Sequence, residues 1–158
     1  MIRTFMIAAA SAAVLALSAT AFAADHGTAD EAKAMLTKAV AAVKADKAKT
    51  LDLINKGEGG FLDRDLYVFC FNSSDGKIVA TGTSNPAGRK VIGQDIRTLK
   101  DPSGKMFGQE QYAGAAKEGQ IAEVNYMFPE PGADTTPDAK VSFVTRVGDL
   151  GCGVGYYK

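Results

Sequence analysis

Two basic residues share one face of a strand-like segment near the C-terminus, and either could bind an anion. The alternation of residues 140–147 places Lys140, Ser142 and Arg146 on that face. A carboxylate ligand needs a fixed cation and a few directed donors in an otherwise apolar pocket. Lys140 and Arg146 are six residues apart, which is about 20 Å along a strand. One small ligand therefore cannot contact both backbones.

Aromatic residues of the preceding segment could form the walls of such a pocket. Residues 120–128 alternate as well, which places Val124, Tyr126 and Phe128 on one face. The Tyr126 hydroxyl could orient a ligand while its ring forms a wall, and Phe128 could add an apolar wall. Ser142, on the face of Lys140, could donate a further hydrogen bond. Ordinary core packing is the other interpretation of Tyr126 and Phe128.

A third basic candidate lies in an irregular middle segment, residues 84–106, which contains two prolines and several glycines. A long connection of this kind inside a compact domain is often a binding loop. Arg89, followed by Lys90, could close over a bound anion, although a pair of solvated basic residues is more common. Lys140 has a similar alternative as a solvated lysine at a strand edge.

Catalytic arrangements and cofactor motifs are missing from the sequence. The single histidine, His26, lies near the start of the chain, so a Ser-His-Asp or Cys-His arrangement has no base. There is no glycine-rich phosphate loop with lysine and Ser/Thr, and no twelve-residue calcium loop. We therefore expect a binding protein that is not an enzyme and holds neither cofactor nor metal.

The two cysteines, Cys70 and Cys152, lie in strand-like stretches at opposite ends of the chain after residue 23. A disulfide between them would close a loop of more than 80 residues and contribute about 4 kcal/mol in the loop-entropy model. Two small buried thiols are the alternative. Geometry decides between them and sequence spacing does not, so both stay open.

The elements expected to position these residues follow a simple order. An amphipathic helix over 28–56 precedes a β-hairpin over 66–83, whose turn contains Asp75-Gly76. After the irregular segment come a helix over 106–117 and strands over 120–128, 140–147 and 150–157. Sequential antiparallel strands with helices segregated to one side predict an α+β sheet domain.

The first 23 residues have the features of a signal peptide. Arg3 precedes an apolar run over 5–17, and Ala21-Phe22-Ala23 fits a small-x-small cleavage site. We expect cleavage after Ala23 and export to the periplasm, with an uncleaved membrane anchor as the alternative. No later segment is apolar enough to cross a bilayer. The remaining residues, 24–158, make one domain with a net charge of −1, which gives no support for nucleic-acid binding.

Several strings in this order resemble the single Cache domain family of extracellular sensor domains. They cover nearly all of residues 28–158 and read Leu66 to Gly76, Val91 to Asp95, Leu99 to Lys105, Asn125 to Gly132, Ala139 to Val144 and Gly153 to Tyr157. The resemblance implies a PAS-like fold, in which a long N-terminal helix packs on a five-stranded antiparallel sheet. It also implies a small ligand, often a carboxylate, between one sheet face and the irregular segment.

The same resemblance favours Lys140 over Arg146 as the ligand cation. Two departures bear on ligand choice: Phe128 stands where the family usually has tryptophan, and Asn85 where histidine is usual. We expect no membrane helix or output domain after Lys158. We therefore expect a sensory module that acts through a membrane chemoreceptor or histidine kinase. The alternative is an interaction protein that has kept the fold and lost the pocket.

Overall fold

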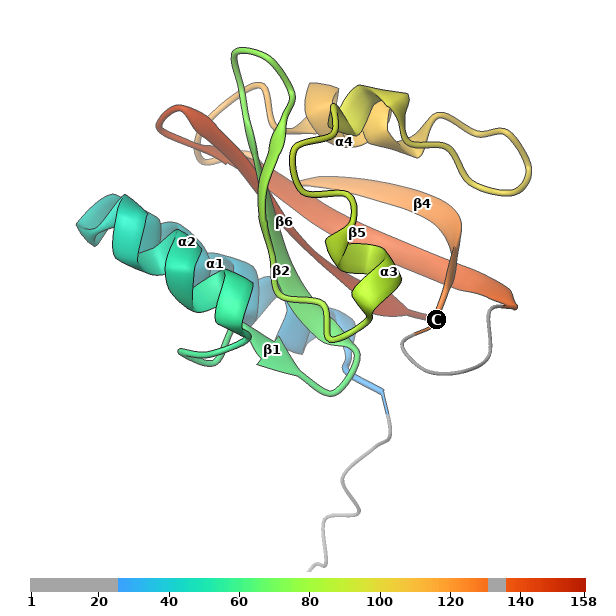
Figure 1. The fold of residues 1–158 in the computed structure, drawn as a ribbon, viewed down its shortest axis with the longest axis horizontal. Coiled ribbons are helices and arrows are strands. Elements are labelled where there is room, and N and C mark those ends of the chain that lie inside the picture. The colour runs from blue at the N-terminus through green and yellow to red at the C-terminus, as the bar shows by residue number, and fades with distance from the viewer. Residues whose placement is uncertain (1–25, 131–135) are drawn as a thin grey trace, which may run out of the picture.

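The computed structural model describes residues 26–130 and 136–158, so the expected signal peptide lies outside the described residues. Within them, one antiparallel sheet has the strand order β1-β2-β6-β5-β4, and β3 pairs with β2 beside β1 (Figure 1). The strands are β1 Leu62–Asp63, β2 Leu66–Asn72, β3 Ile78–Thr81, β4 Ala122–Pro129, β5 Pro137–Val147 and β6 Leu150–Tyr157. The predicted α+β architecture is confirmed, and the two-residue β1 adds to the five expected strands.

The predicted N-terminal helix is two helices, α1 Ala29–Ala45 and α2 Lys47–Lys56. Asp46 interrupts them with an extended backbone, φ −155° and ψ 96°. Its N–H donates to the Ala42 carbonyl, which ends α1, and its carboxylate accepts from the Lys49 N–H at 3.0 Å, which begins α2. The apolar periodicity runs through this break, so it predicted a single helix.

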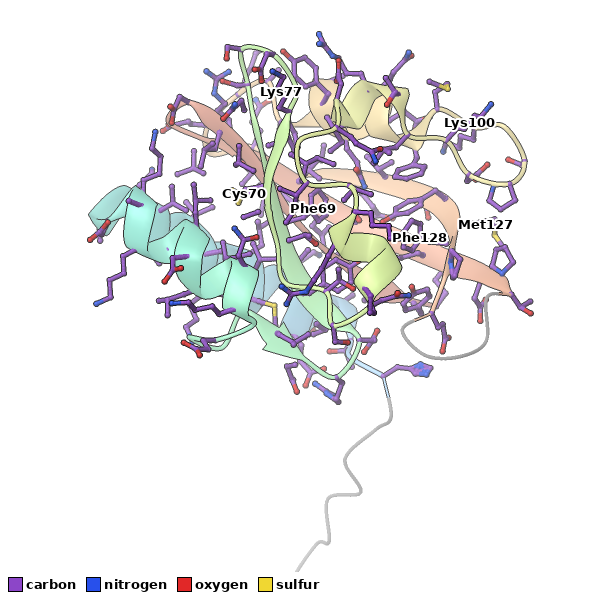
Figure 2. The ribbon with its side chains drawn as sticks, viewed as in Figure 1. Phe69, Cys70, Lys77, Lys100, Met127 and Phe128 are labelled. Atoms are coloured by element: carbon purple, nitrogen blue, oxygen red, sulfur yellow. A yellow bond between two sulfur atoms is a disulfide. The ribbon has the colours of Figure 1, made fainter. Side chains whose placement is uncertain are left out.

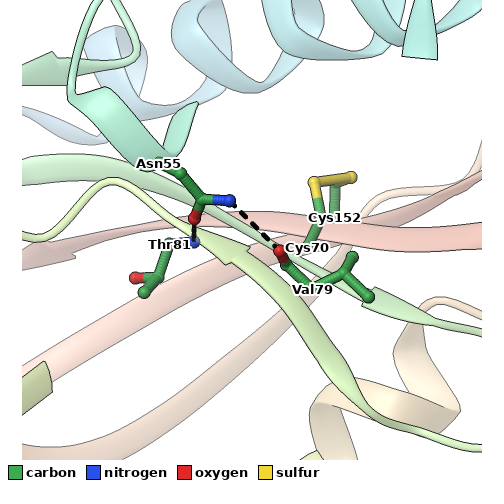
Figure 3. The surroundings of a disulfide bond; sticks show 5 residues. All are labelled: Asn55, Cys70, Val79, Thr81 and Cys152. Carbon is green, nitrogen blue, oxygen red and sulfur yellow. Dashed lines mark hydrogen bonds between the residues drawn. A yellow bond between two sulfur atoms is a disulfide. The ribbon is translucent and has the colours of Figure 1, made fainter. Parts of the chain in front are cut away.

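Helices α1 and α2 cover one face of the sheet (Figure 1). Val68, Cys70 and Val154 point from β2 and β6 into the core beneath α1. A disulfide joins Cys70 and Cys152, which lie directly opposite each other in the register of β2 and β6. Beside it, Asn55 of α2 donates to the Val79 carbonyl at 3.3 Å and accepts from the Thr81 N–H at 3.1 Å (Figure 3). These contacts fasten α2 to the hairpin.

The opposite face carries the irregular segment and the last helix. In chain order these are α3 Pro86–Arg89, a 3-10 turn over Ile96–Thr98, and α4 Phe107–Gly114. Asp101 connects this layer to the sheet edge, because its carboxylate accepts the Met127 N–H of β4 at 3.1 Å. None of the helices in the described part of the chain is long and apolar enough to span a bilayer.

Alternate glycines of β6 make room on this second face. A Cβ at Gly153 would lie 2.5 Å from Cζ of Phe69, and one at Gly155 would lie 2.6 Å from Cε of Lys140. A Cβ at Gly151 would meet the Phe71 ring closer still. Because these three positions lack a side chain, the rings of β2 and the stem of Lys140 can lie flat on the middle of the sheet.

Candidate ligand-binding site

Two adjacent cavities lie between the second sheet face and the layer of α3, the 3-10 turn and α4. The first, of about 130 Å³, is here called the apolar chamber; its lining residues are Tyr67, Phe69, Ile78, Thr81, Gly88, Val91, Ile96, Leu99, Lys100, Phe107, Gln111, Tyr126 and Phe128. The second, of about 210 Å³, is called the tyrosine chamber; it is lined by Tyr67, Thr83, Asn85, Gly88, Val91, Phe128, Pro129 and Tyr157. Four residues line both, so the chambers are contiguous. Figure 2 labels Phe69 and Phe128, two of the rings that line the apolar chamber.

Aromatic rings dominate the apolar chamber. The rings of Phe107 and Tyr126 stack with centroids 4.2 Å apart and an interplanar angle of 10°. The Phe128 ring meets both edge-on, with its centroid 6.2 Å from that of Phe107 and 5.9 Å from that of Tyr126. Such offset and edge-on arrangements are the favoured contacts between rings. The wall is therefore rigid and apolar.

The polar groups at the base of this chamber are paired with each other. The Tyr126 and Ser142 hydroxyls lie 2.8 Å apart, and Gln111, only 2% exposed, also contacts the Tyr126 hydroxyl. Burial raises the pKa of Tyr126 to about 12, so its hydroxyl is neutral at any physiological pH. Ser142 therefore acts on the chamber through Tyr126, because it is not itself among the lining residues.

Lys140 is the most unusual side chain of the site, since it is only 2% exposed. Its ammonium lies over three rings, 4.5 Å from the centroid of Tyr67, 4.4 Å from Tyr157 and 5.3 Å from Phe128. It also donates to the hydroxyls of Tyr67 at 3.4 Å and Tyr157 at 3.3 Å. The alternative of a solvated edge lysine is wrong, because β5 begins at Pro137 and places Lys140 between Tyr126 of β4 and Tyr157 of β6.

Burial lowers the pKa of Lys140 to about 7, and the charges of Asp65 and Glu130 oppose this shift only in part. Asp65 is itself buried. Its Oδ1 accepts the Gly27 N–H at 2.5 Å, while Oδ2 has no hydrogen-bond partner among the described residues. In its protonated form, Lys140 has no direct carboxylate partner, so an incoming anion would stabilise the charged form.

The tyrosines connect this cation to the cavity, because Tyr67 and Tyr157 line the tyrosine chamber and Lys140 does not. Burial raises the pKa of both phenols well above the usual range. The Tyr157 hydroxyl donates to the Pro129 carbonyl at 2.6 Å. The Tyr67 hydroxyl accepts from Lys140 and has no acceptor among the described residues, so its proton is available to a ligand.

The comparisons with known proteins agree with this architecture. The family model described as Single Cache domain 2 matches residues 8–157, nearly the whole chain. The chain belongs to this single Cache domain family. A comparison with curated proteins finds no match.

Three solved structures resemble this Cache domain, each over 81% of its chain. The first is a periplasmic sensor domain of a chemotaxis protein, with 24% identity, a TM-score of 0.58 and 88% of that chain covered. The second is a methyl-accepting chemotaxis protein from Vibrio parahaemolyticus RIMD 2210633, with 17% identity, a TM-score of 0.62 and 86% of that chain covered. The third comes from work on carboxylic acid recognition by a Cache chemosensory domain, with 25% identity, a TM-score of 0.56 and 86% of that chain covered. The family match, together with the Cache chemosensory domain at 25% identity, supports a ligand-binding sensory role.

Arg89 lies outside both chambers of the Cache domain. Its guanidinium donates to the Asn55 carbonyl at 2.7 Å and to the Thr83 carbonyl at 3.1 Å, so it fastens α3 to the end of α2. The cation that does line the apolar chamber is Lys100, an exposed residue of the same irregular segment. No cluster of His, Cys, Asp or Glu in residues 26–130 and 136–158 could hold a metal ion.

Sequence reasoning assigned no functional role to Tyr67 or Tyr157, the two tyrosines whose hydroxyls contact Lys140. Strand β2 is apolar on both faces, so its pattern does not reveal which face borders a cavity. The alternate glycines of β6 could have indicated this face, because large side chains of the neighbouring strands lie over them. Asn85, at a position where the sequence departs from the family, lines the tyrosine chamber.

Proposed function

We propose that this Cache domain is a periplasmic sensory module that binds a small organic carboxylate in the tyrosine chamber. The observation that carries the proposal is the buried Lys140 ammonium behind the hydroxyls of Tyr67 and Tyr157. A carboxylate there accepts the free Tyr67 proton and meets the positive field of Lys140 across the two phenols. Charge-assisted hydrogen bonds of this kind are about twice as strong as neutral ones.

The segment over 84–106 reports the bound state. It contributes Gly88 and Val91 to both chambers, so a ligand contacts it directly. A ligand that favours the closed position of this segment shifts its population, and a membrane chemoreceptor or histidine kinase reads the change. Export follows cleavage of the signal peptide after Ala23. Mass spectrometry of protein from the periplasm should give a mature chain that begins at Ala24.

A calorimetric titration of the purified domain with organic acids tests the binding proposal. A bound acid at one hundred times its Kd should stabilise the fold by about 2.7 kcal/mol in a thermal-shift assay. Lys140→Met keeps the stem and removes the charge, so acid affinity should fall by about 10- to 100-fold. Lys49→Met, on the exposed side of α2, is the matched control and should change nothing.

Two results would contradict the proposal. If none of the organic acids binds, the domain acts as an interaction protein without a ligand. If acids bind equally well to wild type and to Lys140→Met, the anion lies elsewhere, and Lys100 becomes the cation to substitute.

A further inference from the structure

The size of the apolar chamber points to the part of the ligand that it receives. Its volume is about 130 Å³. An engineered apolar cavity of about 150 Å³ in another protein binds benzene. Acetate or propionate needs little more than the tyrosine chamber and would leave the apolar chamber empty. A six-membered ring matches the space that remains.

The walls of the chamber suit an aromatic ring in particular. Five of its lining side chains are aromatic: Tyr67, Phe69, Phe107, Tyr126 and Phe128. The contacts among Phe107, Tyr126 and Phe128 are stacked or edge-on, so an added ring can meet both faces and edges. Ile96 and Leu99 close the other side with aliphatic groups.

The chamber offers little to a second charged group. The Tyr126 hydroxyl is hydrogen-bonded to Ser142 and to Gln111, so a carboxylate beside it would displace an existing pair. The only fully charged side chain in the lining is Lys100, which is exposed to solvent. A group buried here is therefore favoured when it is uncharged.

We infer that the ligand is a monocarboxylate with a phenyl-sized apolar tail, whose carboxylate lies at Tyr67 and whose tail fills the apolar chamber. Tyr67 and Phe128 line both chambers, so one elongated molecule can occupy the two at once. This inference rests on the proposed function and specifies the class of acid that the site selects.

Titration of the wild-type domain with a matched series of acids tests it directly. The probes are acetate, propionate, phenylacetate, 3-phenylpropionate and glutarate. The tail adds buried apolar area, so an aryl acid should bind roughly 10- to 100-fold more tightly than acetate. Equal affinities for acetate and the aryl acids would overturn the inference. So would tightest binding of glutarate, which would place a second carboxylate at Lys100.

A pair of variants locates the tail. Leu99→Phe adds volume to the apolar chamber and should lower aryl-acid affinity at least tenfold more than acetate affinity. Ile92→Phe makes a similar change on the exposed surface of the same segment, where Ile92 is 42% exposed, and should leave both affinities unchanged. If Leu99→Phe fails to fold by circular dichroism, Leu99→Ala replaces it. That variant enlarges the chamber and should shift the preference from phenylacetate toward longer or bulkier tails.

The outcomes separate this inference from the proposed function. If acids bind and Lys140→Met weakens them, but no tail preference exists, only the inference fails. If no acid of the series binds, both fail. An unchanged aryl preference in Leu99→Phe and Leu99→Ala would place the tail outside the apolar chamber and would also reject the inference.

Discussion

The two faces of the sheet are built from the same strands and serve different ends. On the face beneath α1 and α2, sixteen buried apolar residues of the described chain form one continuous cluster. On the opposite face, buried apolar residues divide into two clusters of four, and the two chambers lie beside them. The buried cluster of the helix face stabilises the fold, and the cavity face leaves room for a ligand.

Polar groups are distributed in the same way. The buried cluster of the helix face contains a disulfide and apolar side chains, none of which carries a charge. The cavity face buries Lys140 among three rings with no carboxylate in contact, an arrangement that is unfavourable until an anion arrives. A single sheet therefore separates the requirement to fold from the requirement to bind. Removing the disulfide of the helix face and removing the buried charge of the cavity face should change the free energy of unfolding in opposite directions.

Removal of the disulfide should have the largest effect. Cys70 and Cys152 are 82 residues apart, so the bridge restricts the unfolded chain, and Cys70→Ala with Cys152→Ala should lower the free energy of unfolding by about 4 kcal/mol. Urea unfolding measures this change. Acid affinity should stay within a factor of two in the folded variant. A large loss of affinity would show that the two faces are coupled.

Substitution of Lys140 should instead raise the free energy of unfolding. Lys140→Met removes a buried charge, so the variant should be more stable than wild type by about 3 kcal/mol at pH 6 while it loses acid affinity. The Lys49→Met control should stay within about 0.5 kcal/mol of wild type. A destabilised Lys140→Met would mean that the ring contacts of the ammonium outweigh its burial.

The pH dependence of that difference follows from the pKa of Lys140, lowered by burial to about 7. Below pH 7 the ammonium is protonated in the folded and the unfolded chain, so the burial cost is fully present. Between pH 7 and the unfolded pKa, near 10.4, only the unfolded chain holds the proton, so wild-type stability rises with pH. Urea unfolding at pH 6, 8 and 10 should show the advantage of Lys140→Met shrinking across that window. A constant difference would contradict the assignment.

Much of the fold could be predicted because its signals are local. The Asp75-Gly76 turn, the alternation of β4 and β5, and the amphipathic helix follow from spacing within a few residues. The alternation also placed Tyr126 with Phe128, and Lys140 with Ser142, on shared faces. The break at Asp46 was missed because the same residue type can cap a helix or lie exposed in its middle, and the apolar stripe does not distinguish them.

The site was harder to predict because its chemistry depends on distant segments. The burial of Lys140 requires rings from β2, β4 and β6, together with the open position at Gly155. No spacing near residue 140 encodes these partners. The direction of Arg89 toward α2 likewise depends on the Asn55 carbonyl, 34 residues away in the chain. The sequence therefore named Lys140, Tyr126 and Phe128, which the structure brings together on the cavity face. It did not indicate the contacts of Lys140 with Tyr67 and Tyr157.

Gly155→Ala tests how closely Lys140 packs on β6 at the cavity face. The added Cβ would lie 2.6 Å from Cε of Lys140 and 2.9 Å from Oγ of Ser142, so it should cost about 2 kcal/mol of unfolding free energy and weaken acid binding. A double-mutant cycle supplies the control: in a Lys140→Ala background the same change should cost much less, since the crowded side chain is gone. An equal cost in both backgrounds would assign the strain to the Ser142 hydroxyl or to the backbone of β5.

Thr28→Ala, on the helix face, should have the smallest effect. The Thr28 hydroxyl accepts the Glu31 N–H at 3.2 Å in a capping box at the start of α1, so its loss should lower the free energy of unfolding by about 1 kcal/mol. Thr37→Ala is the matched control, because Thr37 lies exposed within α1 and alanine there should raise stability by a few tenths of a kcal/mol. Neither variant should change acid affinity, since α1 packs on the face without chambers. A shift in affinity on removal of this remote cap would mean that α1 transmits strain through the sheet, and the separation between the two faces would then be incomplete.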